Sequence, residues 1–370
     1  MRTTITDVTV FDGYDVLDGP YDVSFDDSGI TSLTPAGTTT PTGGILDGTG
    51  ATLLPGLIDS HVHFRDLAEL STLAHYGVTT ALDMGSWPAR FTAALRTAES
   101  GADVRSAGTP LIGPAGPHSR IPGFPTEDKI TTPEQARRRV AARVAEGVDY
   151  IKLVLERPGG GGLDLESAAA AVEAAHAAGL KVVAHASHTG AIALAVQAGV
   201  DILTHVPLDA DLDEAQVRAI AEQARVLVPT LSMMRGTARH HPDPEHAYLH
   251  ARNTVTAVHQ AGGAIVAGTD ANTQPGVPAA VPHGSSLHAE LALLVEAGLT
   301  PREALRSATS AAVTAFGLAD RGSIRPGLRA DLLLVTGDPL SAIDATRSIL
   351  AVWTAGRPVD AVAQDTSTQS

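Results

Sequence analysis

The chain has 370 residues, 44% hydrophobic and 18% charged, a composition typical of a globular protein with one large domain or one large and one small domain. Its formal net charge of −15 argues against a nucleic-acid-binding surface, which needs clustered lysine and arginine. Because there is no cysteine, disulfides and thiolate zinc sites are excluded, and any metal must be held by histidine, a carboxylate or a modified lysine.

No apolar run approaches the roughly 20 residues that span a bilayer, and the N-terminus lacks a basic, apolar signal segment. We therefore expect a cytoplasmic protein that binds neither membrane nor nucleic acid. The composition leaves a homo-oligomer open.

The two ends of the chain are predicted to form short β-strands. Residues 3–13 and 21–33 alternate apolar and polar side chains, residues 330–338 and 349–360 contain apolar runs, and Gly, Asp or Pro turn residues bound them. The middle of the chain has a different pattern. We therefore predict a small β-sandwich domain built from residues 1–54 plus 322–370, and a larger domain over residues 55–321.

The middle segment alternates strands with Ala-rich helices. Candidate strands are 57–64, 78–84, 104–113, 149–155, 181–186, 200–206, 225–231 and 263–270, and helical stretches such as 131–147, 163–179 and 299–317 carry capping and stop residues. Eight strands alternating with helices predict an α/β fold, a (β/α)8 TIM barrel. A doubly wound open sheet is the alternative, but no GxGxxG motif follows the first middle strand.

Residues able to bind a metal recur late in these candidate strands, where a barrel of this kind has its active site. His61 and His63 end the first strand and can face one ion, because alternate residues of a strand share a face. An isolated pair of this kind is mostly incidental, but Lys152, His185, His205 and Asp270 occupy strands four, five, six and eight. This donor set suits zinc or another divalent first-row metal.

Lys152 lies within an apolar strand, where a free ammonium group is costly to bury. Burial lowers the pKa of a lysine and makes its amine nucleophilic, so it can add CO₂ and form a carbamate that bridges two cations. The alternative is a lysine that reaches the rim and pairs with an acid such as Asp149.

These six residues resemble the metal centre of the amidohydrolase superfamily. The segments 48–64, 261–271 and 288–340 resemble, respectively, the family's entry into its first strand, its eighth strand and its return to a small β domain. The chain is similar in particular to imidazolonepropionases, Xaa-Pro dipeptidases and ochratoxin-type amidases. Its "HVHFR" segment also resembles that of dihydroorotases and hydantoinases.

The resemblance implies a binuclear centre. One divalent ion, for which we expect zinc, would be held by His61, His63 and Asp270, and a second by His185 and His205. N6-carboxylated Lys152 and a hydroxide would bridge them, and Asp270 would act as general base and then general acid.

Four further residues are candidates for contact with a small-molecule substrate. In dihydroorotase-like relatives an arginine at the place of Arg65 binds a substrate carboxylate; a salt bridge to Asp66 or Glu69 is the alternative. His118, in a Pro/Gly-rich loop, is expected to polarise a carbonyl or stabilise an oxyanion. His188 contacts substrate or caps a helix, and Tyr150 presents its hydroxyl near the site or fills the core.

We therefore predict a metal-dependent hydrolase whose bridging hydroxide attacks an amide-type C–N bond, in a linear amide, dipeptide, N-acyl amino acid, cyclic amide or cyclic imide. One alternative is a mononuclear, deaminase-type member of the same superfamily, in which Lys152 would have no bridging role. Another is a barrel that binds a ligand without turnover.

Overall fold

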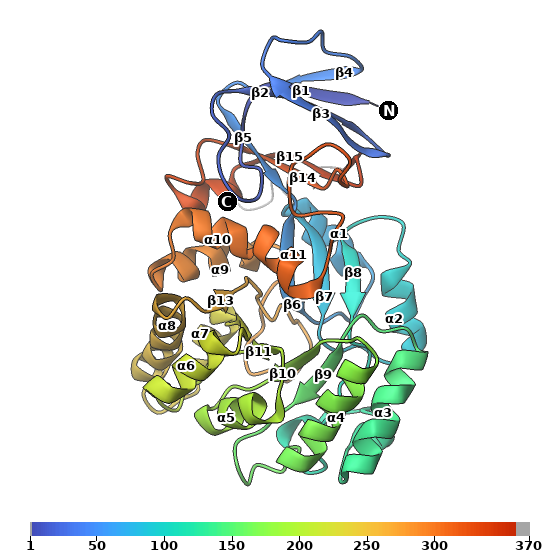
Figure 1. Cartoon of the computed structure of the whole chain (residues 1–370), viewed down its shortest axis with the longest axis vertical. Coiled ribbons are helices and arrows are strands. Elements are labelled where there is room, and N and C mark those ends of the chain that lie inside the picture. Colours follow the sequence, from blue (N-terminus) through green and yellow to red (C-terminus); the bar gives the residue numbers. More distant parts are fainter. Residues whose placement is uncertain (1, 360–370) are drawn as a thin grey trace, which may run out of the picture.

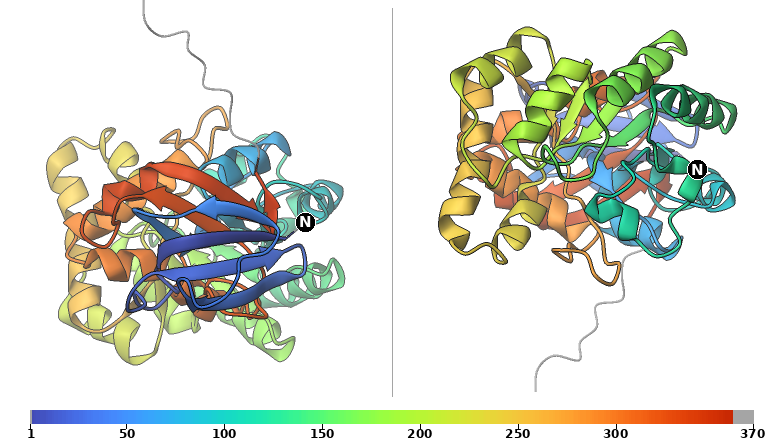
Figure 2. Two further views of the ribbon diagram at one scale, coloured as in Figure 1. Left: turned by 90° about the horizontal axis from the view of Figure 1, so that it is seen from above. Right: turned by 90° about the horizontal axis from the view of Figure 1, so that it is seen from below.

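The computed structural model describes residues 2–359, and within them the two ends of the chain meet in one sheet. Its strands are β1 (Thr3–Val10), β2 (Tyr21–Asp26), β3 (Gly29–Pro35), β4 (Gly44–Asp47), β5 (Ala51–Pro55), β14 (Leu332–Thr336), β15 (Ile349–Thr354) and β16 (Arg357–Pro358). The order is β16-β15-β14-β5-β1-β2-β3, and β4 pairs with β1. This sheet lies across one end of the molecule (Figure 1; Figure 2, left).

The sheet folds over on itself. The first residues of β1 pair with β2 and β4, and its last residues pair with β5, so β1 belongs to both halves. Phe25 of β2 and Trp353 of β15 are separated by three strands in the sheet order, yet their ring centroids are only 5.1 Å apart. The two halves therefore face each other across a shared apolar core, as the two layers of a sandwich do.

The middle of the chain is an α/β structure with two parallel sheets. One contains β6 (Leu57–Val62), β7 (Val78–Asp83) and β8 (Asp103–Ser106). The other contains β9 (Ile151–Val154), β10 (Val182–His185), β11 (Ile202–Thr204), β12 (Val226–Val228) and β13 (Ala264–Ile265). Each overlaps one of the eight expected strands, and each is shorter than expected.

Backbone hydrogen bonds join the two parallel sheets at both of their margins. Beyond β8, Leu111 donates to the carbonyl of Lys152 at 2.9 Å, and beside β6, Ser60 donates to the carbonyl of Ala267 at 2.9 Å. One apolar cluster contains a residue from each strand or its margin: Ile58, Leu82, Ala107, Tyr150, Val183, Ile202, Val228 and Val266. The eight strands thus enclose a common interior.

The helices are α1 (Ala68–His75), α2 (Ala89–Arg96), α3 (Pro133–Ala145), α4 (Leu165–Ala177), α5 (Thr189–Ala198), α6 (Glu214–Glu222), α7 (Leu231–Ala238), α8 (Pro244–Gln260), α9 (Ser285–Glu296), α10 (Pro301–Ser307) and α11 (Ser310–Phe316). Short 3-10 turns are η1 (Pro117–Arg120), η2 (Thr126–Asp128) and η3 (Ile343–Arg347). The helices pack around the parallel strands (Figure 2, right). Within residues 2–359, none is both long and apolar enough to cross a membrane.

The helix caps agree with the capping residues of the sequence in all three expected stretches, since Thr300 accepts a bond from the Glu303 amide at the start of α10. Thr132 accepts a bond from the Gln135 amide at the start of α3, and Asp164 accepts one from Ser167 at the start of α4. The third stretch, 299–317, is divided into α10 and α11. It breaks because the carbonyls of Ser307 and Ala308 accept bonds from Ala267 and Ile58, so they are not available to the next helical turn.

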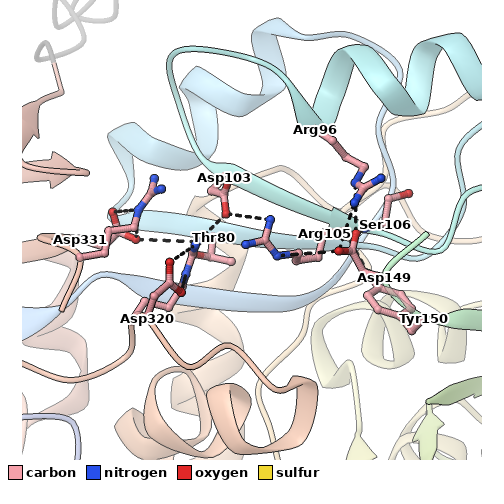
Figure 3. A network of polar contacts seen from close by, with 11 residues as sticks. Thr80, Arg96, Asp103, Arg105, Ser106, Asp149, Tyr150, Asp320 and Asp331 are labelled. Atoms are coloured by element: carbon pink, nitrogen blue, oxygen red, sulfur yellow. Dashed lines mark hydrogen bonds and ion pairs between the residues drawn. The ribbon is translucent and has the colours of Figure 1, made fainter. Parts of the chain in front are cut away.

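Arg321 links the end sheet to the parallel strands. Its side chain is 2% exposed and donates to Thr80 of β7 and to Asp103 of β8, at 3.0 and 2.6 Å. It also pairs with Asp320 and lies 3.9 Å from Asp331, which precedes β14; Figure 3 shows these partners. Because Gly56 donates to the Asp331 carbonyl just before β6, the end sheet covers the amino ends of the strands and leaves their carboxyl ends free.

Candidate metal centre

His61, His63 and Asp270 come together at the carboxyl ends of β6 and β13. Their possible ligand atoms lie within 4.8 Å of one another. One Asp270 carboxylate oxygen, Oδ1, is 3.3 Å from Nε2 of His61 and 3.2 Å from Nε2 of His63. The structure therefore gathers the three residues that the sequence assigned to one ion.

Asp59 fixes the backbone around this group. The β6–β7 register shifts between Asp59 and Val62, where the chain leaves regular pairing. The buried Asp59 carboxylate accepts bonds from the amides of His61 and Thr269, at 3.2 and 3.0 Å, and from the Thr269 hydroxyl at 2.7 Å. It thus connects the strand of His61 to the segment that carries Asp270. Burial raises the pKa of Asp59 to about 7, although these hydrogen bonds oppose the rise.

His185 and His205 lie beside this group, at the ends of β10 and β11. Their ring centroids are 4.6 Å apart, and the ring of His205 is 4.8 Å from that of His61. Lys152 of β9 is 3% exposed and donates from Nζ to the Thr204 hydroxyl at 2.8 Å. All six expected residues thus occupy the same end of the strands.

The pKa values of the histidines of this centre shift in two directions. Burial lowers the pKa of His61 and of His185 well below the usual range and lowers that of His205 to about 3. Burial also lowers the pKa of His63, but contact with the Asp270 carboxylate outweighs this and raises it. Burial raises the pKa of Asp270, but contact with His63 outweighs burial, so that the net pKa of Asp270 is below its usual value.

Burial lowers the pKa of Lys152 to about 7, against the opposing charge of Asp270. A substantial fraction of its amine is therefore uncharged near neutral pH, and an uncharged amine is the form that adds CO₂.

The donor set includes a buried polar atom that makes no well-formed hydrogen bond. Within residues 2–359, Oδ1 of Asp270 is buried and has no partner of hydrogen-bond geometry, although the Nε2 atoms of His61 and His63 converge on it at 3.3 and 3.2 Å. Such atoms are costly unless something satisfies them. Neutral imidazole rings and an ionised carboxylate are ligands that zinc and similar divalent ions prefer. The residues present therefore fit a metal ion.

His118 lies against this centre from η1. Its ring packs edge-to-face on His185, with centroids 4.7 Å apart, and its Nδ1 is 2.9 Å from Oε1 of Glu156. Because an ionised carboxylate only accepts hydrogen bonds, Nδ1 carries a proton in this contact. Glu156 follows β9 and was not singled out from the sequence; its spacing of four residues from Lys152 was the available signal.

Two of the other candidate substrate residues lie near the carboxyl ends of the strands. Arg65 is exposed and donates from Nη1 to the Thr273 carbonyl at 3.3 Å, while its backbone amide donates to Glu69. His188 is the N-cap of α5: Nδ1 accepts from the Gly190 amide at 3.3 Å. The capping alternative for His188 is therefore observed, and substrate contact by either residue stays a prediction.

Tyr150 fills the core, which was the alternative expected for it. It is 3% exposed, and its hydroxyl is shared between the carbonyls of Asp83 and Arg105, at 2.9 and 3.1 Å. Its ring packs against Phe316 of α11. The core alternative for Tyr150 is therefore observed, and contact with substrate stays a prediction.

Comparison with known proteins identifies the group to which this chain belongs. Residues 52–359 match the model of the amidohydrolase family. An uncharacterized protein of Mycobacterium tuberculosis is 29% identical over 321 residues, which cover 78% of this chain and 80% of that protein. The imidazolonepropionase of Deinococcus deserti is 34% identical over 193 residues, covering 50% of this chain and 43% of its own.

Two solved structures share the fold over nearly the whole chain. A Xaa-Pro dipeptidase with bound methionine has a TM-score of 0.83 at 21% identity and covers 97% of this chain and 99% of its own. The ochratoxinase of A. niger has a TM-score of 0.81 at 20% identity, with coverage of 98% and 96%. These likenesses show a shared fold. The chain belongs to the amidohydrolase family and is a hydrolase.

Proposed function

We propose that this chain is a binuclear metal-dependent amidohydrolase that cleaves an amide-type C–N bond. Its catalytic domain is a (β/α)8 barrel over residues 55–321, and its small β-sandwich domain comprises residues 1–54 and 322–370, of which 360–370 lie outside the described residues. The hydrogen bonds across both margins of the parallel sheets and the shared interior cluster support the barrel.

The observation that carries the proposal is the gathering of six donor side chains at the carboxyl ends of five strands. His61, His63 and Asp270 would hold one ion, which their mutual distances support. His185 and His205 would hold the second, with carboxylated Lys152 between the two. When bound, a pair of divalent ions, for which we favour zinc, would lower the pKa of a shared water and polarise the scissile carbonyl.

The chain's own residues would move the proton and hold the carbonyl. Contact with His63 favours the ionised form of Asp270, so its carboxylate can accept a proton from the attacking water and pass it to the leaving nitrogen. His118, with Nδ1 held by Glu156, can turn its Nε2 edge to the substrate carbonyl. Arg65, at the rim, can pair with a carboxylate of the substrate.

A mononuclear, deaminase-type reaction is the second candidate. It is favoured by the fact that, within residues 2–359, the closely spaced three-ligand group consists of His61, His63 and Asp270. Two observations favour the binuclear proposal: the burial of Lys152 and the packing of His185 against His205.

The experiment is a metal titration combined with a substrate panel. Metal-free protein is reconstituted with zinc, and bound metal per chain is counted by mass spectrometry alongside hydrolysis of N-acyl amino acids, dipeptides, cyclic imides and amino-purines. We expect two ions per chain and hydrolysis of amides. His185→Asn should lose one ion, whereas His246→Asn, on the remote helix α8, should keep both. One ion per chain with deamination would replace the proposal by the mononuclear alternative.

A further inference from the structure

Glu290 is a fully buried acid in an otherwise apolar stretch of α9, at 0% exposure. Its Oε1 accepts a bond from the Leu231 amide and its Oε2 one from the Ser232 amide, each at 2.7 Å. These are the first amides of α7, which have no acceptor within their own helix. Glu290 therefore caps α7 from the neighbouring helix.

Thr230 occupies the N-cap position of α7 but does not cap it. A threonine at that position commonly accepts a bond from an amide two or three residues later. Its side chain makes no such bond among the described residues; Oγ1 lies instead 2.6 Å from Nδ1 of His205. Its φ of 49° lies in the left-handed region, which a β-branched residue rarely adopts, so the surrounding contacts must hold it there.

The contact between Thr230 and His205 involves the Nδ1 atom of the ring, so its direction is linked to the tautomer of His205. His205 is 1% exposed, and its ring lies between those of His61 and His185. A neutral imidazole carries one proton, so an Nδ1–H bond to Oγ1 leaves the lone pair on Nε2. That tautomer is the one required of a histidine that binds a metal through Nε2.

We propose that Glu290 is a positioning residue for His205 and acts through Thr230. Because Glu290 takes over the cap of α7, the Thr230 hydroxyl is free to hold His205 in its Nδ1–H tautomer. The inference rests on the proposed function only in the assignment of His205 to the second ion.

The first test uses variants that remove either the Glu290 carboxylate or the Thr230 hydroxyl. Glu290→Gln keeps the size of the side chain but turns an amide NH₂ group toward one helix amide, and Thr230→Val keeps the shape without the hydroxyl. We expect each to weaken binding of the second zinc ion by about 10- to 100-fold in competition with a chelator. The double variant should bind no more weakly than Thr230→Val, because both changes act on one contact.

Matched controls separate positioning from general destabilisation. Asp331→Asn removes another buried carboxylate, at the opposite end of the strands beside Arg329, and should lower the melting temperature without changing affinity for the second ion. Thr230→Ser retains the hydroxyl and should keep near-native affinity. Should Glu290→Gln not fold, Glu290→Asp, which draws the carboxylate back from α7, is expected to weaken the second site in the same way.

The second test does not depend on metal. Nitrogen-15 NMR of histidine-labelled, metal-free protein, with His205 assigned through His205→Asn, should report the Nδ1–H tautomer. That tautomer should lose population in Glu290→Gln and Thr230→Val. Glu290 variants that keep the native tautomer and second-ion affinity while Thr230→Val changes both would overturn the inference. If the tautomer responds but the native protein binds a single ion, the positioning role stands and the binuclear proposal fails.

Discussion

Lys152 donates a hydrogen bond from Nζ to the hydroxyl of Thr204, 2.8 Å away, in the buried interior between β9 and β11. Thr204 in turn donates to the Ala184 carbonyl at 3.1 Å, so the amine has a fixed neighbour at the level of the histidines. A buried lysine among candidate metal ligands is costly for stability, and this cost suits a chemical role for Lys152.

Replacement of Lys152 tests that role. Lys152→Ala should lower activity by more than roughly 100-fold, which is the cost of losing an outer hydrogen-bond partner, because it would remove the proposed bridge between the two ions. Added propionate should restore part of the activity by supplying a carboxylate in the vacated space. Mass spectrometry of the native protein should find one CO₂ on Lys152; absence of both rescue and adduct would contradict the carbamate.

Asp270→Asn should reduce rate more than metal content. The amide keeps the size and one neutral donor oxygen, but it cannot accept a proton, and loss of a general base costs roughly 10²- to 10⁴-fold in kcat. Turnover and bound zinc per chain are measured on the same preparation. If the variant lost bound metal and turnover in equal proportion, Asp270 would be a metal ligand without a role in proton transfer.

Arg65→Ala should discriminate between substrates. A hydrogen bond to a charged group is worth about 1.5–3 kcal/mol, which corresponds to a rise in KM of roughly ten- to more than a hundredfold for carboxylate-bearing substrates. The matched substrate with an amide in place of the carboxylate should be unaffected. An equal rise in KM for both substrates would mean that Arg65 stabilises the rim of the site through its bond to the Thr273 carbonyl and does not bind the substrate carboxylate.

His288 should make stability dependent on pH. Burial lowers its pKa to about 4, from the usual 6.5, and its Nε2 lies 2.9 Å from the Tyr76 carbonyl. Because the unfolded chain binds the proton more readily, this contribution is complete above about pH 6.5 and is lost as the pH falls toward 4. Between pH 8 and pH 5 the free energy of unfolding should fall by about 2 kcal/mol from this group.

Urea denaturation at the two pH values measures this loss. His288→Gln, which can still donate to the Tyr76 carbonyl, removes the titrating group and should show a pH dependence smaller by that amount. The same pH dependence in variant and native protein would assign the effect to other groups.

The chain order of strands and the histidines at their ends could be predicted because both depend on local pattern. Alternation of apolar segments with capped helices identifies the repeats, and the carboxyl ends of parallel strands must meet at one edge. This reasoning needs no knowledge of which side chains touch. It fails where long-range contact matters: the Tyr150 hydroxyl bonds to the carbonyls of Asp83 and Arg105. Likewise, helix 299–317 divides because strand amides bond to the carbonyls of Ser307 and Ala308.

The candidate donor set of this protein can be read from its sequence alone. The identities and spacing of His61, His63 and Asp270 are chemical facts of the chain, and the period of two along a strand places the histidine pair on one face. Only the tertiary structure decided which groups support them. Glu156 lies 38 residues from His118, and Glu290 lies 59 residues from the helix amide of Leu231 that it accepts from. Such contacts depend on how whole elements pack, and no local periodicity encodes that distance.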